Sequence, residues 1–472
     1  MLLYQINPDY YRQIIEAKNL AGAGSNLSFY NLVRLNLPHI QEMGYDVVWL
    51  MPLFVRGDHS KKGNGSPYSV KKYQLDPKFG TVSELNSLIS AVHFANMQII
   101  CEYVPNHLSP DADLFLTHPE CAYRDENGKF LHDQNWTDTV KLISTHPETQ
   151  KYTAQNLDYI LNTLGFDGLR LDMAHMVFYD IQGNDLYTKG HNFWHDVFAI
   201  FSHRNKFFFG EVYDDKSSGY YDAERLTSAG IIPYEKKEFD ILERKFHGSD
   251  ENIQNETEKL FHALNYFSKF QSFLRFASNH DDNPGIEKFG GEQQFKIAFT
   301  LLSFISQYFV HYSGDEYGLL GKPSITGENI TVNDKLVETT ELKFSQNADQ
   351  LYDYFKNINI VFRETRKKYS LHQCILADDT GKENSSELAC IRVSENEIIL
   401  LVANLSLDKI WSYCSRIENK NFYDFLSEKN WNTYSVTNLI SQEKYGSHDK
   451  SEYLWIGLSG LDIQILSLTR VG

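Results

Sequence analysis

The chain has 472 residues, 42% of them hydrophobic, which suggests about three domains, or one large barrel and an accessory domain. Its 62 acidic and 45 basic residues give a formal net charge of −17, which argues against nucleic acid or an anionic membrane surface as a partner. The five cysteines are scattered without CxxC spacing, which indicates free thiols in a reducing compartment and argues against a disulfide framework or a zinc site.

The first residues of the chain show no basic stretch followed by a long apolar run, so no signal peptide is predicted. No later segment is long and apolar enough for us to predict a membrane span. We therefore expect a cytoplasmic protein. Its oligomeric state is left open.

Strand and helix patterns alternate along the first 370 residues. Helical spacing of apolar residues predicts a helix at 83–95, and 148–164 is a second helical segment. Repeated strand–helix units of this number predict an α/β fold that closes into a (β/α)₈ TIM barrel rather than an open sheet. Short apolar runs predict its strands at residues 2–6, 46–54, 97–104, 166–171, 206–212, 271–277 and 309–312.

Two segments depart from this alternation. Residues 108–135 are polar and irregular, which predicts a small inserted domain after the third strand. Near residue 371 the composition changes, and strands at 388–394, 397–405 and 453–468 predict an antiparallel β domain with one short helix near 421–426. We therefore expect a barrel formed by 1–107 and 136–370, an insertion at 108–135 and a separate domain at 371–472.

Charged side chains stand at the predicted ends of several strands. The carboxyl ends of the strands of such a barrel converge on one mouth. A single pair such as Arg170 and Asp172 is equally well explained as an ordinary ion pair at a strand end. The whole set at successive strand ends favours a catalytic site, and it consists of His107, Arg170, Asp172, Glu211, His280 and Asp281.

Two of these carboxyl groups differ in their expected surroundings. Arg170 lies two residues before Asp172 on the same strand face, so its guanidinium predicts a lowered pKa and an ionised Asp172. Glu211 follows three phenylalanines and a glycine, and an apolar setting near other carboxylates predicts a raised pKa. Hydrolysis of a glycosidic bond needs such a pair of carboxyl groups in different protonation states.

Four motifs contain these strand-end residues: Glu-Tyr-Val-Pro-Asn-His at 102–107, Gly-Leu-Arg-Leu-Asp at 168–172, Gly-Glu-Val at 210–212 and the stretch 276–281 that ends in Asn-His-Asp. They resemble the motifs of glycoside hydrolase family 13, the α-amylase family. Residues 65–70, 76–81 and 312–316 resemble further stretches of the family. The resemblance covers nearly the whole chain and implies a barrel, a small domain B after the third strand and a C-terminal β-sandwich.

The resemblance also implies a retaining mechanism. Asp172 would be the nucleophile, Glu211 the general acid and base, and Asp281 the residue that binds the −1 sugar and stabilises the transition state. Arg170 would orient Asp172, and Tyr68 would stack on the −1 sugar ring. The residues that we expect to bind substrate are Tyr68, His107, Arg170, His175 and His280.

The chain departs from the family pattern at several positions. Glu102 stands where the family usually has Asp, and His175 and Met176 stand where many α-amylases have Lys and His. The fifth-region position, 140–143, matches no subgroup signature well. Asn106 matches a calcium ligand of the family, so calcium stays open, although the sequence does not supply the six or more oxygen ligands that calcium takes. We expect no other cofactor.

These patterns predict an α-amylase-like hydrolase whose substrate is an α-1,4-linked glucan or maltooligosaccharide. Two alternatives stay open. The first is a transglycosylase or α-glucosidase of the same family, because hydrolysis and transfer differ only in whether water or a sugar reaches the intermediate. The second belongs to a different class, a non-catalytic carbohydrate-binding scaffold.

Overall fold

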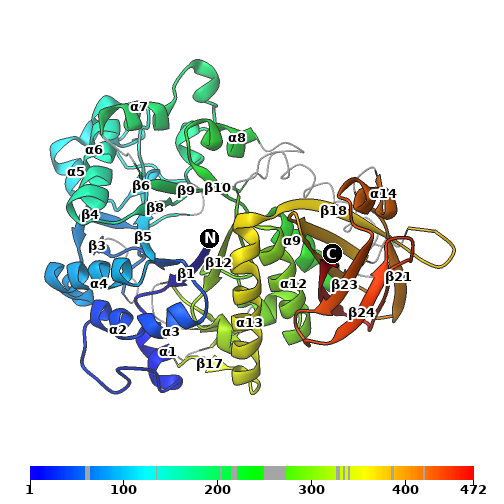
Figure 1. The fold of residues 1–472 in the computed structure, drawn as a ribbon. Helices are drawn as coiled ribbons and strands as arrows, with labels where there is room; N and C mark the ends of the chain where they lie inside the picture. The colour runs from blue at the N-terminus through cyan, green and yellow to red at the C-terminus, as the bar shows by residue number, and fades with distance from the viewer. Residues whose placement is uncertain are drawn as a thin grey trace.

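The computed structural model describes residues 1–58, 64–133, 136–201, 205–213, 221–248, 273–325, 330–332, 335–337, 341–383, 387–417 and 420–471. Within them, eight parallel strands close into a barrel, which confirms the predicted α/β class (Figure 1). In chain order these strands are β1 (Leu2–Ile6), β2 (Val47–Leu50), β5 (Gln98–Tyr103), β8 (Gly168–Leu171), β9 (Phe207–Glu211), β10 (Ile232–Tyr234), β11 (Leu274–Phe276) and β12 (Tyr308–Tyr312).

Strand β10 is the one barrel strand that the sequence pattern does not predict. It has three residues and includes Pro233, so it offers neither an apolar run nor an alternating pattern. Its neighbours hold it in register, with Ile232 opposite Phe209 and Tyr234 opposite Leu274. The predicted strand at 271–277 corresponds to β11, and its first two residues lie outside the described part of the chain.

Helices surround the barrel. Helix α4 (Val82–Phe94) confirms the helix predicted at 83–95: Thr81 and Glu84 form a capping box, and Leu88 and Val92 lie on its buried face. The predicted segment 148–164 is α6 (Pro147–Asp158), continued by a π-helical turn (Tyr159–Thr163). The other barrel helices are α1 (Tyr11–Ala17), α2 (Phe29–Leu35), α3 (Leu37–Glu42), α7 (Phe193–Ile200), α8 (Tyr221–Ser228), α9 (Lys237–His247), α11 (Gly285–Phe289), α12 (Glu292–Ile305) and α13 (Ala348–Lys368).

The excursion after β5 leaves the barrel and returns to it through one short ladder. Strand β6 (His107–Leu108) pairs antiparallel with β7 (Val140–Lys141), and helix α5 (Asp113–Thr117) lies between them in sequence. A second hairpin, β3 (Phe54–Arg56) with β4 (Val70–Leu75), carries the loop that bears Tyr68. Small ladders after the barrel are β13 (Leu319–Leu320) with β17 (Lys343–Phe344), and β14 (Lys322–Pro323) with β15 (Ile330–Val332) and β16 (Lys335–Val337).

The described residues from 370 onward form an antiparallel β domain (Figure 1). The predicted short helix is α14 (Phe422–Glu428). The strands are β18 (Ser370–Ala377), β19 (Glu387–Val393), β20 (Glu397–Asn404), β21 (Ile410–Ile417), β22 (Lys420–Asn421), β23 (Thr433–Asn438), β24 (Lys444–Asp449), β25 (Trp455–Leu458) and β26 (Asp462–Val471).

Strand β20 joins this domain to the barrel because both of its faces are buried. Ile399 and Leu401 belong to the core that includes the barrel, whereas Ile398 and Leu400 belong to the core of the C-terminal domain. Helix α12 packs against β20 and β26. Arg392 adds a polar link, since its side chain donates to the carbonyl oxygen of Phe304 at 2.7 Å.

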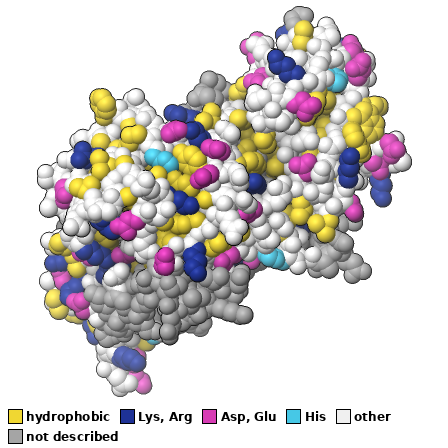
Figure 2. All heavy atoms as spheres, turned by 90° about the horizontal axis from the view of Figure 1, so that it is seen from below, with side chains coloured by type: hydrophobic (Ala, Val, Ile, Leu, Met, Phe, Trp, Pro, Cys, Tyr) yellow, Lys and Arg dark blue, Asp and Glu magenta, His cyan; other side chains and the backbone are white. Residues whose placement is uncertain are grey.

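Sequence-based predictions also concern the cysteines, the surface charge and membrane spans. Each of the five cysteines is buried and has a free thiol. On the face seen in Figure 2, acidic and basic side chains are interspersed rather than gathered into a field of one sign. Among the described residues, we find no helix with the length and apolarity needed to cross a membrane.

Candidate active site

Arg170 is the centre of the polar cluster at the carboxyl ends of the barrel strands. Its side chain is completely buried at the end of β8. Nη1 lies 2.7 Å from Asp172 and 2.8 Å from Glu102, and Nη2 lies 2.7 Å from Glu211. Because β5, β8 and β9 are neighbours in the barrel, three carboxyl groups from these strands meet one guanidinium.

Glu102 fills the position where the resemblance leads us to expect Asp. One of its oxygens accepts a hydrogen bond from Trp49 Nε1 at 3.0 Å, and the other contacts Arg170. Burial raises the pKa of Glu102 to about 7, and the charge of Arg170 opposes this rise. The longer side chain is therefore accommodated between an indole and a guanidinium.

The pKa of Asp172 differs from the sequence prediction. Burial raises the pKa of this carboxyl well above its ordinary value, and the nearby carboxylates of Glu211 and Glu102 add to the rise. The guanidinium of Arg170 acts in the opposite direction, as predicted, but several carboxyl groups share it. The expectation of a lowered pKa was wrong because it treated Arg170 and Asp172 as an isolated pair.

Glu211 is held by a backbone group as well as by Arg170. Its Oε2 accepts a hydrogen bond from the amide of Met173 at 2.8 Å. Met173 has φ +42°, a left-handed conformation that costs a non-glycine residue about 1–2 kcal/mol. In this conformation the amide of Met173, directly after Asp172, points toward the Glu211 side chain at the end of β9.

His280 lies between three polar groups on the opposite side of the mouth. Its Nδ1 is 3.0 Å from Nε2 of Gln5, and its Nε2 is 2.5 Å from the hydroxyl of Tyr68 and 3.2 Å from Asp281. Burial, assisted by the charge of Arg170, lowers the pKa of His280 to about 3. The Asp281 side chain is 41% exposed, so this carboxylate is open to a ligand.

His107 lies on the other flank of the nucleophile candidate. Its Nε2 is 4.0 Å from Oδ2 of Asp172, and burial lowers the pKa of His107 to about 4. Both histidines are therefore neutral at physiological pH. Neutral imidazoles beside carboxylates can donate to or accept from sugar hydroxyls without adding charge.

Comparison with known proteins fits this geometry. The family profile of the alpha amylase catalytic domain matches residues 33–125 and 120–357 of the chain. The chain belongs to the α-amylase family. The resemblance of the four motifs is thereby confirmed, and with it membership of a family of glycoside hydrolases.

Relatives of this α-amylase-family chain include proteins of several named activities. A cyclomaltodextrinase of a Bacillus species is 23% identical over 394 residues, 78% of this chain and 64% of that protein. Alpha-amylase 2 of Dictyoglomus thermophilum is 21% identical over 392 residues (78% and 62%), and an alpha-glucosidase of Apis mellifera is 22% identical over 380 residues (68% and 63%). The chain spans a little under two thirds of the length of each.

Solved structures share the fold along the whole chain. The noncanonic maltogenic alpha-amylase AmyB of Thermotoga neapolitana superimposes with a TM-score of 0.74 at 18% identity, covering 100% of this chain and 99% of that one. The alpha-amylase of Geobacillus thermoleovorans, solved with acarbose, gives 0.72 at 17% identity, covering 100% and 98%. At these identities the likeness concerns the α-amylase-family fold.

The predicted residue His175 adjoins the backbone of Glu211. It is buried, and its Nδ1 is 3.2 Å from the backbone oxygen of Glu211. The ring thus contacts the backbone of β9. Asn106 also has a protein partner, since its Oδ1 accepts a hydrogen bond from Nζ of Lys141 at 2.5 Å.

Several residues that build the site were not predicted. Trp49 supports Glu102, Gln5 supports His280, and Tyr234 accepts a hydrogen bond from Asn279 at 3.1 Å. Gln5 carried a usable signal, because it is a polar residue inside an otherwise apolar first strand. Trp49 and Tyr234 carried none, because aromatic residues in barrel strands are usually core residues.

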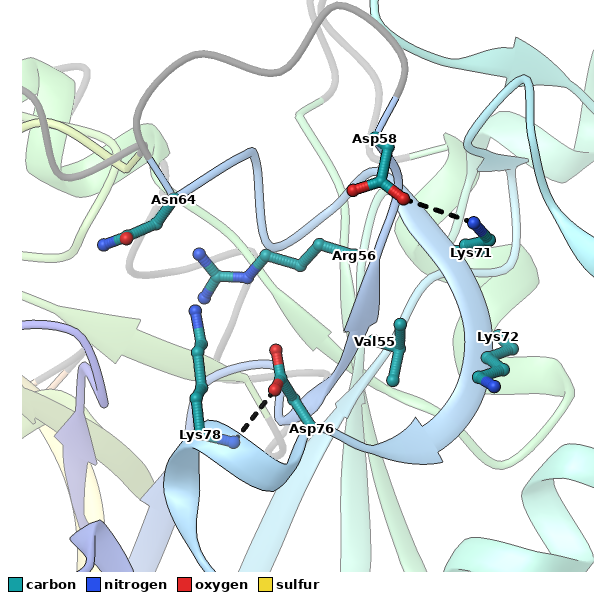
Figure 3. A pocket seen from close by; sticks show the side chains of 8 residues that line it. All are labelled: Val55, Arg56, Asp58, Asn64, Lys71, Lys72, Asp76 and Lys78. Atoms are coloured by element: carbon teal, nitrogen blue, oxygen red, sulfur yellow. Dashed lines mark hydrogen bonds and ion pairs between the residues drawn. The ribbon is translucent and has the colours of Figure 1, made fainter.

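A hollow of about 350 Å³ lies beside the hairpin β3–β4 (Figure 3). Arg56 and Lys78 line it, and both form ion pairs with Asp9, at 2.5 and 3.1 Å. Arg56 also donates to the carbonyl oxygen of Gly65 at 2.9 Å. Through this hydrogen bond Arg56 ties the loop that bears Tyr68 to strand β3 beside the hollow.

Proposed function

We propose that the chain is a retaining hydrolase of α-1,4-linked glucans and maltooligosaccharides. The observation that carries this proposal is the single guanidinium of Arg170, which contacts both Asp172 and Glu211 at 2.7 Å. Retaining enzymes need their two carboxyl groups only about 5 Å apart, since one attacks the sugar directly. Two carboxyl groups that share the terminal nitrogens of one guanidinium suit such a close spacing. Cytoplasmic location remains a prediction from the sequence.

In the proposed mechanism the two carboxyl groups take different roles. Asp172, in its ionised form, attacks the anomeric carbon while Glu211, in its protonated form, gives its proton to the departing glycosidic oxygen, so that a covalent glycosyl-enzyme forms. Glu211 then removes a proton from the incoming water, which attacks the same carbon and releases Asp172. Arg170 orients both carboxylates, and the strained turn at Met173 fixes Glu211 through a backbone amide.

The −1 sugar would lie between the two flanks of the mouth. Tyr68 offers its ring for stacking on the sugar, a use suited to an aromatic face. His107 and His280 would contact the sugar hydroxyls as neutral imidazoles. The exposed carboxylate of Asp281 suits two further hydroxyls and the positive charge of the transition state.

The direct test is release of reducing sugar from soluble starch and from maltoheptaose by the wild type and by Glu211→Gln. The amide keeps the size of the side chain but supplies no proton, so we expect activity to fall by a factor of about 10³ or more. Glu428→Gln, at an exposed ion pair with Lys420 in the C-terminal domain, is the matched control. Equal activities of wild type and Glu211→Gln would refute the assignment of the general acid.

A second candidate is transfer of the glycosyl group to a sugar, or exo-action on short chains. This candidate stays open because His175 and Met176 stand where many α-amylases have the Lys and His that contact an acceptor-side sugar. Product analysis with maltoheptaose separates the candidates: products longer than the substrate mean transfer, and glucose alone means exo-action. A folded wild type that acts on neither starch, maltoheptaose nor cyclomaltodextrin would support the carbohydrate-binding scaffold instead.

A further inference from the structure

Lys141 places its ammonium group inside the protein at the base of the inserted segment. The residue lies in β7 and is only 1% exposed. Its Nζ donates to Oδ1 of Asn106 at 2.5 Å and to the carbonyl oxygen of Met176 at 3.0 Å, and it lies 3.7 Å from Oδ1 of Asp133. These oxygens come from three separate places: the end of β5, the turn after β8 and the insertion.

An amide oxygen, a backbone carbonyl and a carboxylate are the kinds of ligand that a hard divalent cation takes. Asn106 is also the residue that the family resemblance marks as a calcium ligand. Here these oxygens surround the ammonium group of Lys141, so the position where a cation would bind already carries a positive charge. Among the described residues, we find no cluster of three or more His, Cys, Asp or Glu side chains that would offer a metal another place. The residues present therefore do not fit calcium.

We propose that the Lys141 ammonium takes the place of a structural cation, so that the protein keeps its active form without calcium. A buried ammonium is costly unless oxygen atoms surround it, and here it has three such partners from three segments. In this role Lys141 holds the insertion against the carboxyl ends of β5 and β8.

The same network reaches the active site, which makes Lys141 a positioning residue. Asn106 uses its other side-chain atom, Nδ2, to donate to Asp133 at 2.8 Å, and this nitrogen lies 3.2 Å from Nδ1 of His107. His107 in turn faces Asp172 across 4.0 Å. A loss of the Lys141 charge should therefore disturb the orientation of His107 as well as the docking of the insertion.

The first test uses the wild-type protein. After treatment with EGTA we expect no stoichiometric calcium by elemental analysis, and a Tm that stays within about 1 °C when millimolar calcium is added, because bound ligand raises Tm only where a site exists. One calcium per chain, or a Tm that falls on chelation, would overturn the proposal. Neither readout depends on the proposed enzymatic function.

The second test changes the charge at this position. Lys141→Met should lower Tm by about 5 °C or more, whereas Lys151→Met, at an exposed lysine on α6, should leave it unchanged. Lys141→Asp adds a carboxylate to the same oxygens, so we expect its Tm to be low in EGTA and to rise with calcium. A Lys141→Met protein as stable as the control, or a Lys141→Asp protein indifferent to calcium, would contradict the proposal. Should neither variant fold, the wild-type measurement decides.

Discussion

Nη2 of Arg170 lies 2.7 Å from Oε2 of Glu211, the residue that we propose as general acid. The other terminal nitrogen of the same guanidinium lies equally close to Asp172, the proposed nucleophile. One buried side chain therefore sets the positions of both reacting carboxyl groups relative to each other. Any change in its shape must act on both.

Replacement of Arg170 by Lys tests this shared role. A lysine keeps the charge but cannot contact Glu102, Asp172 and Glu211 in the fixed geometry of a planar fork. We expect kcat to fall by a factor of about 100 or more, and the free energy of unfolding to fall by about 3 kcal/mol.

Steady-state kinetics and urea denaturation measure these two effects. Arg225→Lys is a matched control, because Arg225 is also buried and forms ion pairs with Asp185 and Asp222, outside the carboxylate cluster. It should lose stability without a large loss of kcat. A kcat of Arg170→Lys within threefold of wild type would contradict the shared role.

Shortening Glu102 to Asp should weaken the site, although Asp is the usual residue in the family. The Glu102 carboxylate contacts both Trp49 and Arg170, and removal of one methylene must lengthen one of these contacts. We expect a loss of about 1–3 kcal/mol in the free energy of unfolding, measured by urea denaturation. Glu102→Gln keeps the length and separates the effect of charge from that of reach. Equal stability of Glu102→Asp and wild type would show that β5 can move to compensate.

The two histidines of the mouth should not appear in the pH profile of activity near pH 6.5. Burial lowers the pKa of His280 to about 3 and that of His107 to about 4, so both are neutral between pH 5 and 8. His280→Asn should lower kcat/KM by a factor of about 10–100 through lost hydrogen bonds, while both limbs of the profile keep their midpoints. The loss of one limb in this variant would mean that His280 titrates in the wild type.

Stability should decline as the pH rises because of Asp315, which is buried after β12. Burial raises the pKa of Asp315 from 3.8 to about 8, so the folded protein holds a proton that the unfolded chain releases. This contribution is fully present below pH 3.8 and is lost as the pH rises through 8. Asp315→Asn removes it, so the fall in Tm between pH 5 and pH 8 should be smaller in the variant. An unchanged fall would show that Asp315 is ionised in the folded protein.

The barrel and its strand-end residues could be predicted because they obey local patterns. Apolar runs mark seven of the strands, and residues that follow a run must lie at one mouth once the barrel closes. The structure places Arg170, Asp172 and Glu211 in one cluster for that reason. Strand β10 was not predicted, because its formation depends on pairing with its neighbours rather than on a pattern in its own three residues.

Quantities that depend on several segments at once could not be predicted. The pKa of Asp172 is set by burial and by carboxyl groups from other strands, whereas the sequence shows only the nearby arginine. The side-chain oxygen of Asn106 accepts a hydrogen bond from Lys141, which is 35 residues away in the stretch that matches no family subgroup well. In both cases the decisive contact is between residues that no sequence spacing relates.

The double burial of β20 has a consequence for how the molecule unfolds. A chain cut after residue 370 would leave apolar side chains of the barrel core uncovered, and a separate C-terminal piece would expose Ile399 and Leu401. We therefore expect the two domains to unfold as one cooperative unit, although the composition changes sharply between them. A calorimeter should record a single melting transition rather than two.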